Sequence, residues 1–99
     1  MELRIGVAYG SDPERVIDLL TKTAASQPLT ATTPPPEAFM KEFGADAILF
    51  DLVFWTDTPV RALRAHSDVA VAANAALTAA GIEIPFPQRV VHLQGNDKS

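Results

Sequence analysis

Two stretches of the chain, residues 2–9 and 48–55, alternate in polarity with the two-residue period of a β-strand. In the first stretch, the apolar face comprises Leu3, Ile5, Val7 and Tyr9. In the second stretch, one face is wholly apolar and comprises Ile48, Phe50, Leu52 and Phe54. Its opposite face is mixed and comprises Leu49, Asp51, Val53 and Trp55. The pattern predicts that residues 48–55 form the central strand of a sheet.

Helix-start residues followed by helical spacing predict two helices. Ser11 or Asp12 can cap the first helix, and Ser11 with Glu14 forms a capping box. The first helix should end near Ser26, because Pro28 cannot continue it. The second helix is longer and rich in alanine. We expect it to start with Asp57 or Thr58 as its cap and Pro59 in its first turn, and to end at Gly81.

Weaker patterns occupy the rest of the chain. Residues 30–36, rich in Thr and Pro, predict an irregular surface connection. Residues 37–43 are a strand candidate, and the small residues 44–46 predict a reversal into a hairpin. Residues 82–84 begin a last strand. It must be an edge strand or break, because Pro85 and Pro87 lack the N–H that a sheet ladder needs.

The predicted order is strand, helix, strand, strand, helix, strand, which is the βαββαβ order of the ferredoxin-like fold. We therefore expect an α+β sandwich with an antiparallel or mixed sheet and both helices on one face. Residues 1–94 form this single domain, and residues 95–99 are a polar tail. The large apolar groups at inward positions should share one core: Ile5, Val7, Leu19, Phe50, Leu52, Phe54 and Leu63.

The mixed face of the central strand is more apolar than a solvated face requires. Leu49, Val53 and Trp55 are covered either by a partner or by packing within the chain. Asp51 in their midst argues against a second full core, because an unpaired buried carboxylate costs several kcal/mol.

Composition is that of a soluble acidic domain. The 99 residues carry a net charge of −4, which would repel a phosphate backbone, so we expect no nucleic-acid partner. The absence of cysteine excludes disulfides and cysteine-ligated metals. The longest apolar run, residues 69–73, is too short to cross a bilayer, and no signal-peptide pattern follows Met1.

No arrangement of residues predicts catalysis. His66 and His92 lie on different elements without a metal-ligand spacing, and the carboxylates are scattered through turns, caps and helices. Gly6 and Gly10 lack the third glycine of a nucleotide-binding loop. We expect no enzyme activity, no cofactor and no metal.

Three segments together resemble one family. They are VAYGSDPERV at residues 7–16, FDLVFW at residues 50–55 and RAHSDVAVAANAALTAAGIEIPFPQRVVHL at residues 64–93. Within the last, GIEIPFPQ at residues 81–88 is the most specific motif. The chain resembles, over nearly its whole length, the C-terminal cytoplasmic domain of the small-conductance mechanosensitive channel (MscS) family.

The resemblance implies part of a bacterial inner-membrane channel that opens under bilayer tension and releases osmolytes during hypo-osmotic shock. In that family a heptamer encloses a cytoplasmic vestibule with side portals. The resemblance therefore implies a homo-oligomer at the cytoplasmic face of the membrane, which meets the membrane only through segments that this chain lacks. By itself, we expect the fragment to lack a pore, to be soluble, and to be monomeric or weakly associated.

The candidate subunit interface combines the mixed sheet face with the chain that leaves the domain. Two prolines separated by one residue rigidify this exit and favour redirection toward neighbouring subunits, although one proline alone serves equally to end an edge strand. In the family, the chain beyond this motif can enter a small intersubunit barrel, and residues 89–93 are the matching stretch. The candidate interface residues are Leu49, Val53, Trp55, Pro85, Phe86, Pro87, Gln88 and Arg89.

A hypothesis of a different class is a free-standing regulatory domain of the same fold. Such a domain would bind a small ligand at a dimer interface, with the mixed sheet face as the dimer surface. The sequence preceding Glu2 in the native gene distinguishes the two hypotheses. Transmembrane segments there would favour the channel, and an enzyme domain would favour the regulatory role.

Overall fold

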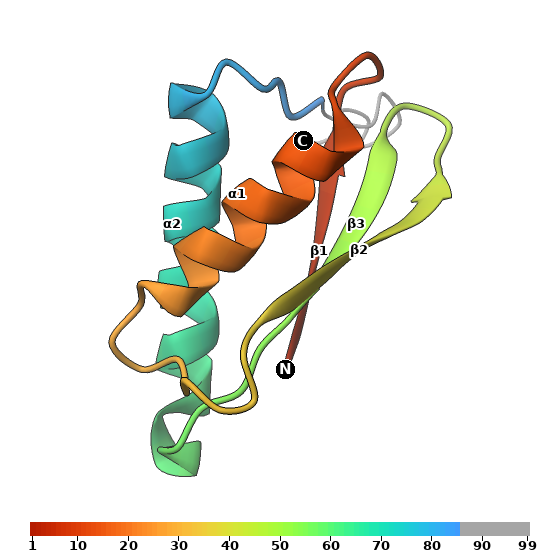
Figure 1. Cartoon of the computed structure of the whole chain (residues 1–99). Helices are drawn as coiled ribbons and strands as arrows, with labels where there is room; N and C mark the ends of the chain where they lie inside the picture. The colour runs from red at the N-terminus through yellow and green to blue at the C-terminus, as the bar shows by residue number, and fades with distance from the viewer. Residues whose placement is uncertain (86–99) are drawn as a thin grey trace, which may run out of the picture.

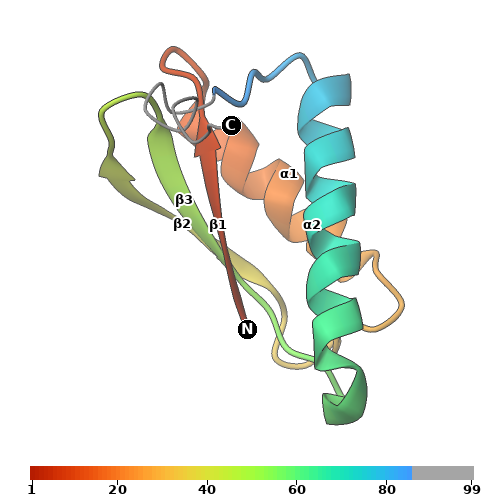
Figure 2. The same ribbon diagram turned by 180° about the vertical axis from the view of Figure 1, so that it is seen from behind.

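The computed structural model of the chain describes residues 1–85 and places two helices on one face of a three-stranded sheet (Figures 1 and 2). The elements in chain order are β1 (Glu2–Val7), α1 (Pro13–Ala25), β2 (Glu37–Phe43), β3 (Ile48–Val53), η1 (Pro59–Arg61) and α2 (Ala62–Ala79). The strand order is β1-β3-β2, and both pairings are antiparallel. The predicted ferredoxin-like α+β fold is confirmed, with β3 as the central strand.

The register of the sheet places the apolar residues of β1 and β3 on the face that the helices cover. Ile5 lies opposite Phe50, and Val7 lies opposite Ile48. Since directly opposed residues of an antiparallel pair share a face, β1 and β3 present one continuous apolar surface to α1 and α2. The core residues that are fully buried and largest are Phe50, Phe54, Leu20, Leu52, Leu77, Val7, Val16 and Val69.

The first helix begins with a side-chain cap and ends where the sequence predicts. Asp12 is the N-cap, and its Oδ1 accepts a hydrogen bond from the Glu14 N–H at 3.1 Å. The Ser11 hydroxyl instead donates to the Ala8 carbonyl at 2.8 Å, so the capping box predicted between Ser11 and Glu14 is not the arrangement present. The segment 30–36 contains neither helix nor strand, as expected.

The second helix ends in a glycine motif. Gly81 has a φ of +77°, the Gly81 N–H donates to the Thr78 carbonyl at 3.1 Å, and the Ile82 N–H donates to the Leu77 carbonyl at 2.9 Å. This pair of bonds is the Schellman arrangement, which satisfies the last helical carbonyls. Leu77 and Ile82 are both in the core, so the motif also turns the departing chain back against the domain.

The start of the second helix differs from the prediction. A 3₁₀ turn, η1, precedes α2, and Thr58 makes no side-chain cap. Leu63 is 84% exposed and not in the core, which corrects the prediction made for it, and Leu19 is partly buried against the core. Leu63 lies two residues before Ala65, which begins the buried stripe of α2 (Ala65, Val69, Ala73 and Leu77), so Leu63 is on the opposite side of the first turn and faces solvent.

Within residues 82–85, the predicted last strand is not present. The segment makes one ladder-like contact, in which the Ala8 N–H donates to the Glu83 carbonyl at 2.9 Å beside the end of β1. This contact is at the outer edge of β1, which is itself an edge strand of the sheet. The second part of that prediction, residues 89–93, and the proposed tail at 95–99 lie outside the described residues.

Candidate subunit interface

The face of the sheet turned away from the helices carries three rows of opposed residues. The first row is Glu2, Val53 and Glu37, the second is Arg4, Asp51 and Phe39, and the third is Gly6, Leu49 and Glu42. Both helices lie on the other face (Figures 1 and 2). We call this surface the outer sheet face.

Asp51 occupies the centre of the outer sheet face and is only 6% exposed. The Arg4 Nε lies 3.1 Å from its Oδ1, and the Lys41 Nζ lies 3.4 Å from its Oδ2. Lys41 falls at the β-bulge between Met40 and Glu42, where the register of β2 against β3 shifts. Both carboxylate oxygens therefore have a cationic partner, so the burial of Asp51 does not carry the cost of an unpaired buried carboxylate.

The electrostatics of this group follow from those contacts. The hydrogen bond from Arg4 lowers the pKa of the Asp51 carboxyl, and it outweighs the desolvation that acts in the opposite direction. The same hydrogen bond raises the pKa of the Arg4 guanidinium. The ion pairs of Asp51 with Arg4 and Lys41 form a charged strip in the middle of the outer sheet face, with the half-exposed Phe39 beside it. The other apolar residues of this face fall into two groups.

The first group lies at the hairpin end of the sheet. Leu49 and Pro85 line a hollow of about 270 Å³ together with Gly6, Gly44, Ala45, Asp46, Ala47 and Ile84. A Cβ on Gly44 would lie 2.9 Å from the Ala47 carbonyl oxygen, so this reversal requires glycine. The structure thus brings together two predicted interface residues that are far apart in the sequence.

The second group lies at the opposite end of the sheet. Val53 is half-buried between Glu2 and Glu37, and Trp55 is half-buried just beyond the strand. The Trp55 carbonyl accepts a hydrogen bond from the Ala31 N–H at 2.7 Å. Val53 and Leu49 are separated by four residues of strand, about 13 Å. Phe86, Pro87, Gln88 and Arg89, also predicted for the interface, lie outside the described residues.

Several exposed apolar residues were missed by the sequence analysis. Val60, Leu63 and Val71 of η1 and α2 are 92%, 84% and 67% exposed. At the hairpin end, Tyr9 and Phe43 stack with their ring centroids 6.2 Å apart, and the Tyr9 hydroxyl donates to the Gly44 carbonyl. The signal available in the sequence was that η1 and α2 carry large apolar residues on more than one face.

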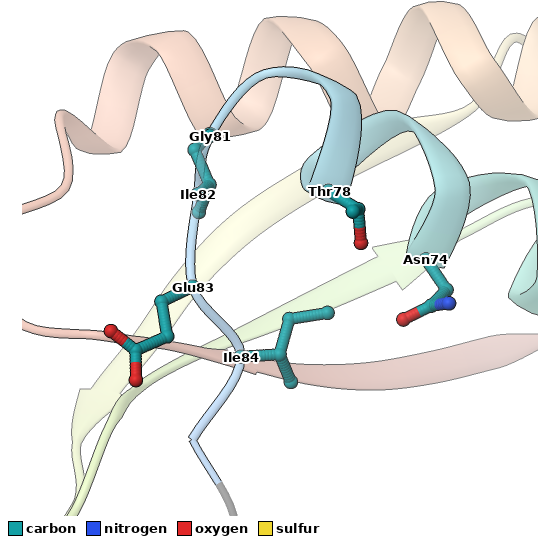
Figure 3. Close-up of a pocket in the computed structure, with 6 residues that line it drawn as sticks. All are labelled: Asn74, Thr78, Gly81, Ile82, Glu83 and Ile84. Atoms are coloured by element: carbon teal, nitrogen blue, oxygen red, sulfur yellow. The ribbon is translucent and has the colours of Figure 1, made fainter.

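A further hollow lies between the end of α2 and the departing chain (Figure 3). Its volume is about 470 Å³, and it is lined by Asn74, Thr78, Gly81, Ile82, Glu83 and Ile84. Asn74 and Thr78 project from α2 toward Ile84, whereas the Glu83 carboxylate points away from them. Among residues 1–85, no three His, Cys, Asp or Glu side chains gather closely enough to hold a metal ion.

Within the same residues, neither helix is long and apolar enough to cross a membrane. The class that the fold and these surfaces define is a small ferredoxin-like α+β domain with exposed apolar surfaces at both ends of its sheet and along one helix.

Comparison with known families identifies the domain. The sequence model of the family described as "Mechanosensitive ion channel MscS, C-terminal" matches residues 1–84. The chain therefore belongs to the MscS family of mechanosensitive ion channels and corresponds to its C-terminal domain, as the resemblance of its motifs implied.

Individual relatives agree with this assignment. The chain is 42% identical over 65 residues to the mechanosensitive channel MscK of Escherichia coli, a match that covers 66% of this chain and 5% of the channel. It is 27% identical over 90 residues to an uncharacterized MscS family protein of Archaeoglobus fulgidus, covering 91% of this chain and 31% of that protein.

A solved structure shares the fold. The crystal structure of Helicobacter pylori MscS in the closed state matches with a TM-score of 0.81 and 26% identity, covering 89% of this chain and 35% of that chain. The chain thus spans about a third of that channel subunit, and smaller or similar parts of the other relatives. Family membership favours the channel hypothesis over the free-standing regulatory domain.

Proposed function

We propose that this domain is the cytoplasmic vestibule and assembly module of a mechanosensitive channel that releases osmolytes on hypo-osmotic shock. In this proposal the complete subunit is held in the inner membrane by other segments. The subunits form a homo-oligomer, a heptamer, and the domain carries out no enzymatic reaction. By itself, the fragment is soluble, does not conduct, and is monomeric or weakly associated.

The observation that carries the proposal is the match of residues 1–84 to the C-terminal domain of the family, together with the structural likeness to about a third of a channel subunit. The surface chemistry is consistent with it. Apolar side chains are exposed at Val60, Leu63 and Phe43, and such residues are suited to contacts with neighbouring protein. A paired carboxylate, Asp51, keeps the outer sheet face from closing into a second core.

A chimaeric channel tests the proposal. This domain replaces the C-terminal domain of the Helicobacter pylori channel, and the chimaera is produced in cells that lack their own mechanosensitive channels. We expect the chimaera to restore survival after transfer from high to low osmolarity. The matched control carries Phe54→Ala, which removes a fully buried core side chain, and it should restore survival poorly. A chimaera that reaches the membrane in normal amounts but gives no survival above empty vector would contradict the proposal.

A further inference from the structure

The 3₁₀ turn η1 and the first turn of α2 together present a basic and apolar surface that no other described residue covers. Val60 and Leu63 are 92% and 84% exposed and lie three residues apart, so they share one side of the first turns. Arg61 and Arg64 flank them, and both are exposed. Arg64 pairs with Asp68 at 3.1 Å, while Arg61 is in no ion pair among residues 1–85. We call this surface the α2 knob.

The outer sheet face offers the complementary arrangement at the same end of the molecule. In its first row, Val53 lies between Glu2 and Glu37, and both carboxylates are exposed. Because neighbouring strands are about 4.8 Å apart, the two acidic residues stand roughly 10 Å from each other with an apolar residue between them. Neither glutamate is in an ion pair among the described residues. We call this row the acidic row.

The two surfaces cannot meet within one copy. The α2 knob is in the helix layer, which covers one face of the sheet. The acidic row is on the other face, the outer sheet face (Figures 1 and 2). Contact between two knobs would bring arginines against arginines, and contact between two acidic rows would bring glutamates against glutamates. Charge complementarity therefore favours a knob of one copy against the row of another.

We propose that the α2 knob of one subunit packs against the acidic row of the next subunit. Arg61 and Arg64 face Glu37 and Glu2, and Leu63 lies against Val53. Such a contact is heterologous, because each copy contributes a different surface, and repetition of a heterologous contact closes into a ring when the rotation allows. The inference rests on the proposed function only in assuming that the subunits assemble with one another.

Disulfide cross-linking tests this pairing, because the chain has no cysteine of its own. Leu63→Cys and Val53→Cys chains, distinguished by a mass tag, are mixed in equal amounts at high concentration and oxidised. We expect mixed dimers well above the half that random pairing gives. The matched control mixes Val71→Cys with Val53→Cys, since Val71 is on the same helix and also exposed but about two turns further along. This control should give only the random proportion.

Charge exchange provides the second measurement. Arg61→Glu on the Leu63→Cys chain, or Glu37→Lys on the Val53→Cys chain, should each lower the yield of mixed dimer by about threefold. Both changes together should restore it. Lys22→Glu, an exposed charge change on α1, serves as the control and should have no effect.

Three results would overturn the inference. They are a preference for Leu63→Cys homodimers, a mixed yield equal to that of the Val71→Cys control, or two charge changes whose effects add instead of cancelling. Folding of each variant is verified by its circular dichroism spectrum and melting temperature. These outcomes are independent of the survival of the chimaera, so failure of the contact and failure of the channel role are distinguishable.

Discussion

At the scale of single residues, the environment of Asp51 determines the character of the outer sheet face. Its carboxylate is 6% exposed and paired with Arg4 and Lys41. A buried carboxylate without such partners would be strongly unfavourable, so the pair of cations is what permits an acidic residue at the centre of the central strand. The sequence indicated that Asp51 keeps this face from forming a second full core, but it did not predict the partners of Asp51. The position of Lys41 depends on a β-bulge that the alternation of β2 does not reveal.

Asp51 should make stability depend on acid pH. Its pKa is lowered in the folded state, so its contribution is present above the unfolded pKa and is lost as the pH falls through the folded pKa. We expect the urea midpoint of the wild type to fall as the pH is lowered from about 5 to about 2, and that of Asp51→Asn to fall less. Asp46→Asn, at an exposed turn, is the control and should behave like the wild type. Parallel curves for wild type and Asp51→Asn would refute this role.

Truncating a core side chain and truncating a side chain of the α2 knob should differ greatly in their cost to stability. Phe54 is fully buried, so Phe54→Ala should lower the free energy of unfolding by about 3 to 5 kcal/mol. Leu63→Ala removes a side chain that is 84% exposed, so its cost should be below about 0.5 kcal/mol. Denaturant unfolding measures both values. Comparable losses at the two positions would show that Leu63 belongs to the core after all.

At the scale of elements, the sequence predicts what local chemistry controls. The alternation of residues 48–55 predicted β3 and its buried face, and the start and stop residues predicted α1 almost to its ends. The sequence does not predict contacts that depend on packing between segments far apart in the chain. The sequence shows that Leu63 is apolar, but only the rotation of α2 against the rest of the domain decides that Ala65, and not Leu63, faces the core. Of the predicted interface, Leu49 and Pro85 come together because the chain crosses the end of β1 after Gly81.

Gly81 is the element-scale position most open to test. Its φ of +77° lies in the left-handed region, which L-residues with a Cβ adopt at a cost. We expect Gly81→Ala to lower the free energy of unfolding by about 1 kcal/mol and Gly81→Asn to lower it less, since asparagine tolerates this region. Thermal and urea unfolding provide the measurement. Equal losses for the two variants would mean that space, not backbone conformation, limits this position.

At the scale of the whole molecule, the domain has few means of assembling alone. Its exposed apolar residues form small separate groups: Val60, Leu63 and Val71 on η1 and α2, Tyr9 and Phe43 at the hairpin end of the sheet, and Phe39 and Met40 on β2. Stable interfaces usually bury upwards of about 1,200 Å² in total, which such groups do not supply singly. In our account, assembly therefore combines weak contacts of this domain with contacts made elsewhere in the complete subunit.

We expect the 99-residue chain to be mostly monomeric in solution. Sedimentation of the 99-residue chain at micromolar concentration should give mostly a species near the monomer mass of 10.6 kDa. Weak association should appear only at much higher concentration and should decrease with added salt, because charged contacts between exposed groups are screened. A stable heptamer at micromolar concentration would show that the domain encodes the assembly by itself.

Patch-clamp recording of the chimaeric channel tests the central claim most directly. If this domain is the assembly module of a mechanosensitive channel, membrane patches containing the chimaera should show currents that open with suction. Currents should be sharply reduced when the domain carries Phe54→Ala, because an unfolded domain cannot hold its neighbours. Full currents from a channel in which the domain is unfolded or absent, or no currents from an intact chimaera present in the membrane, would contradict the account.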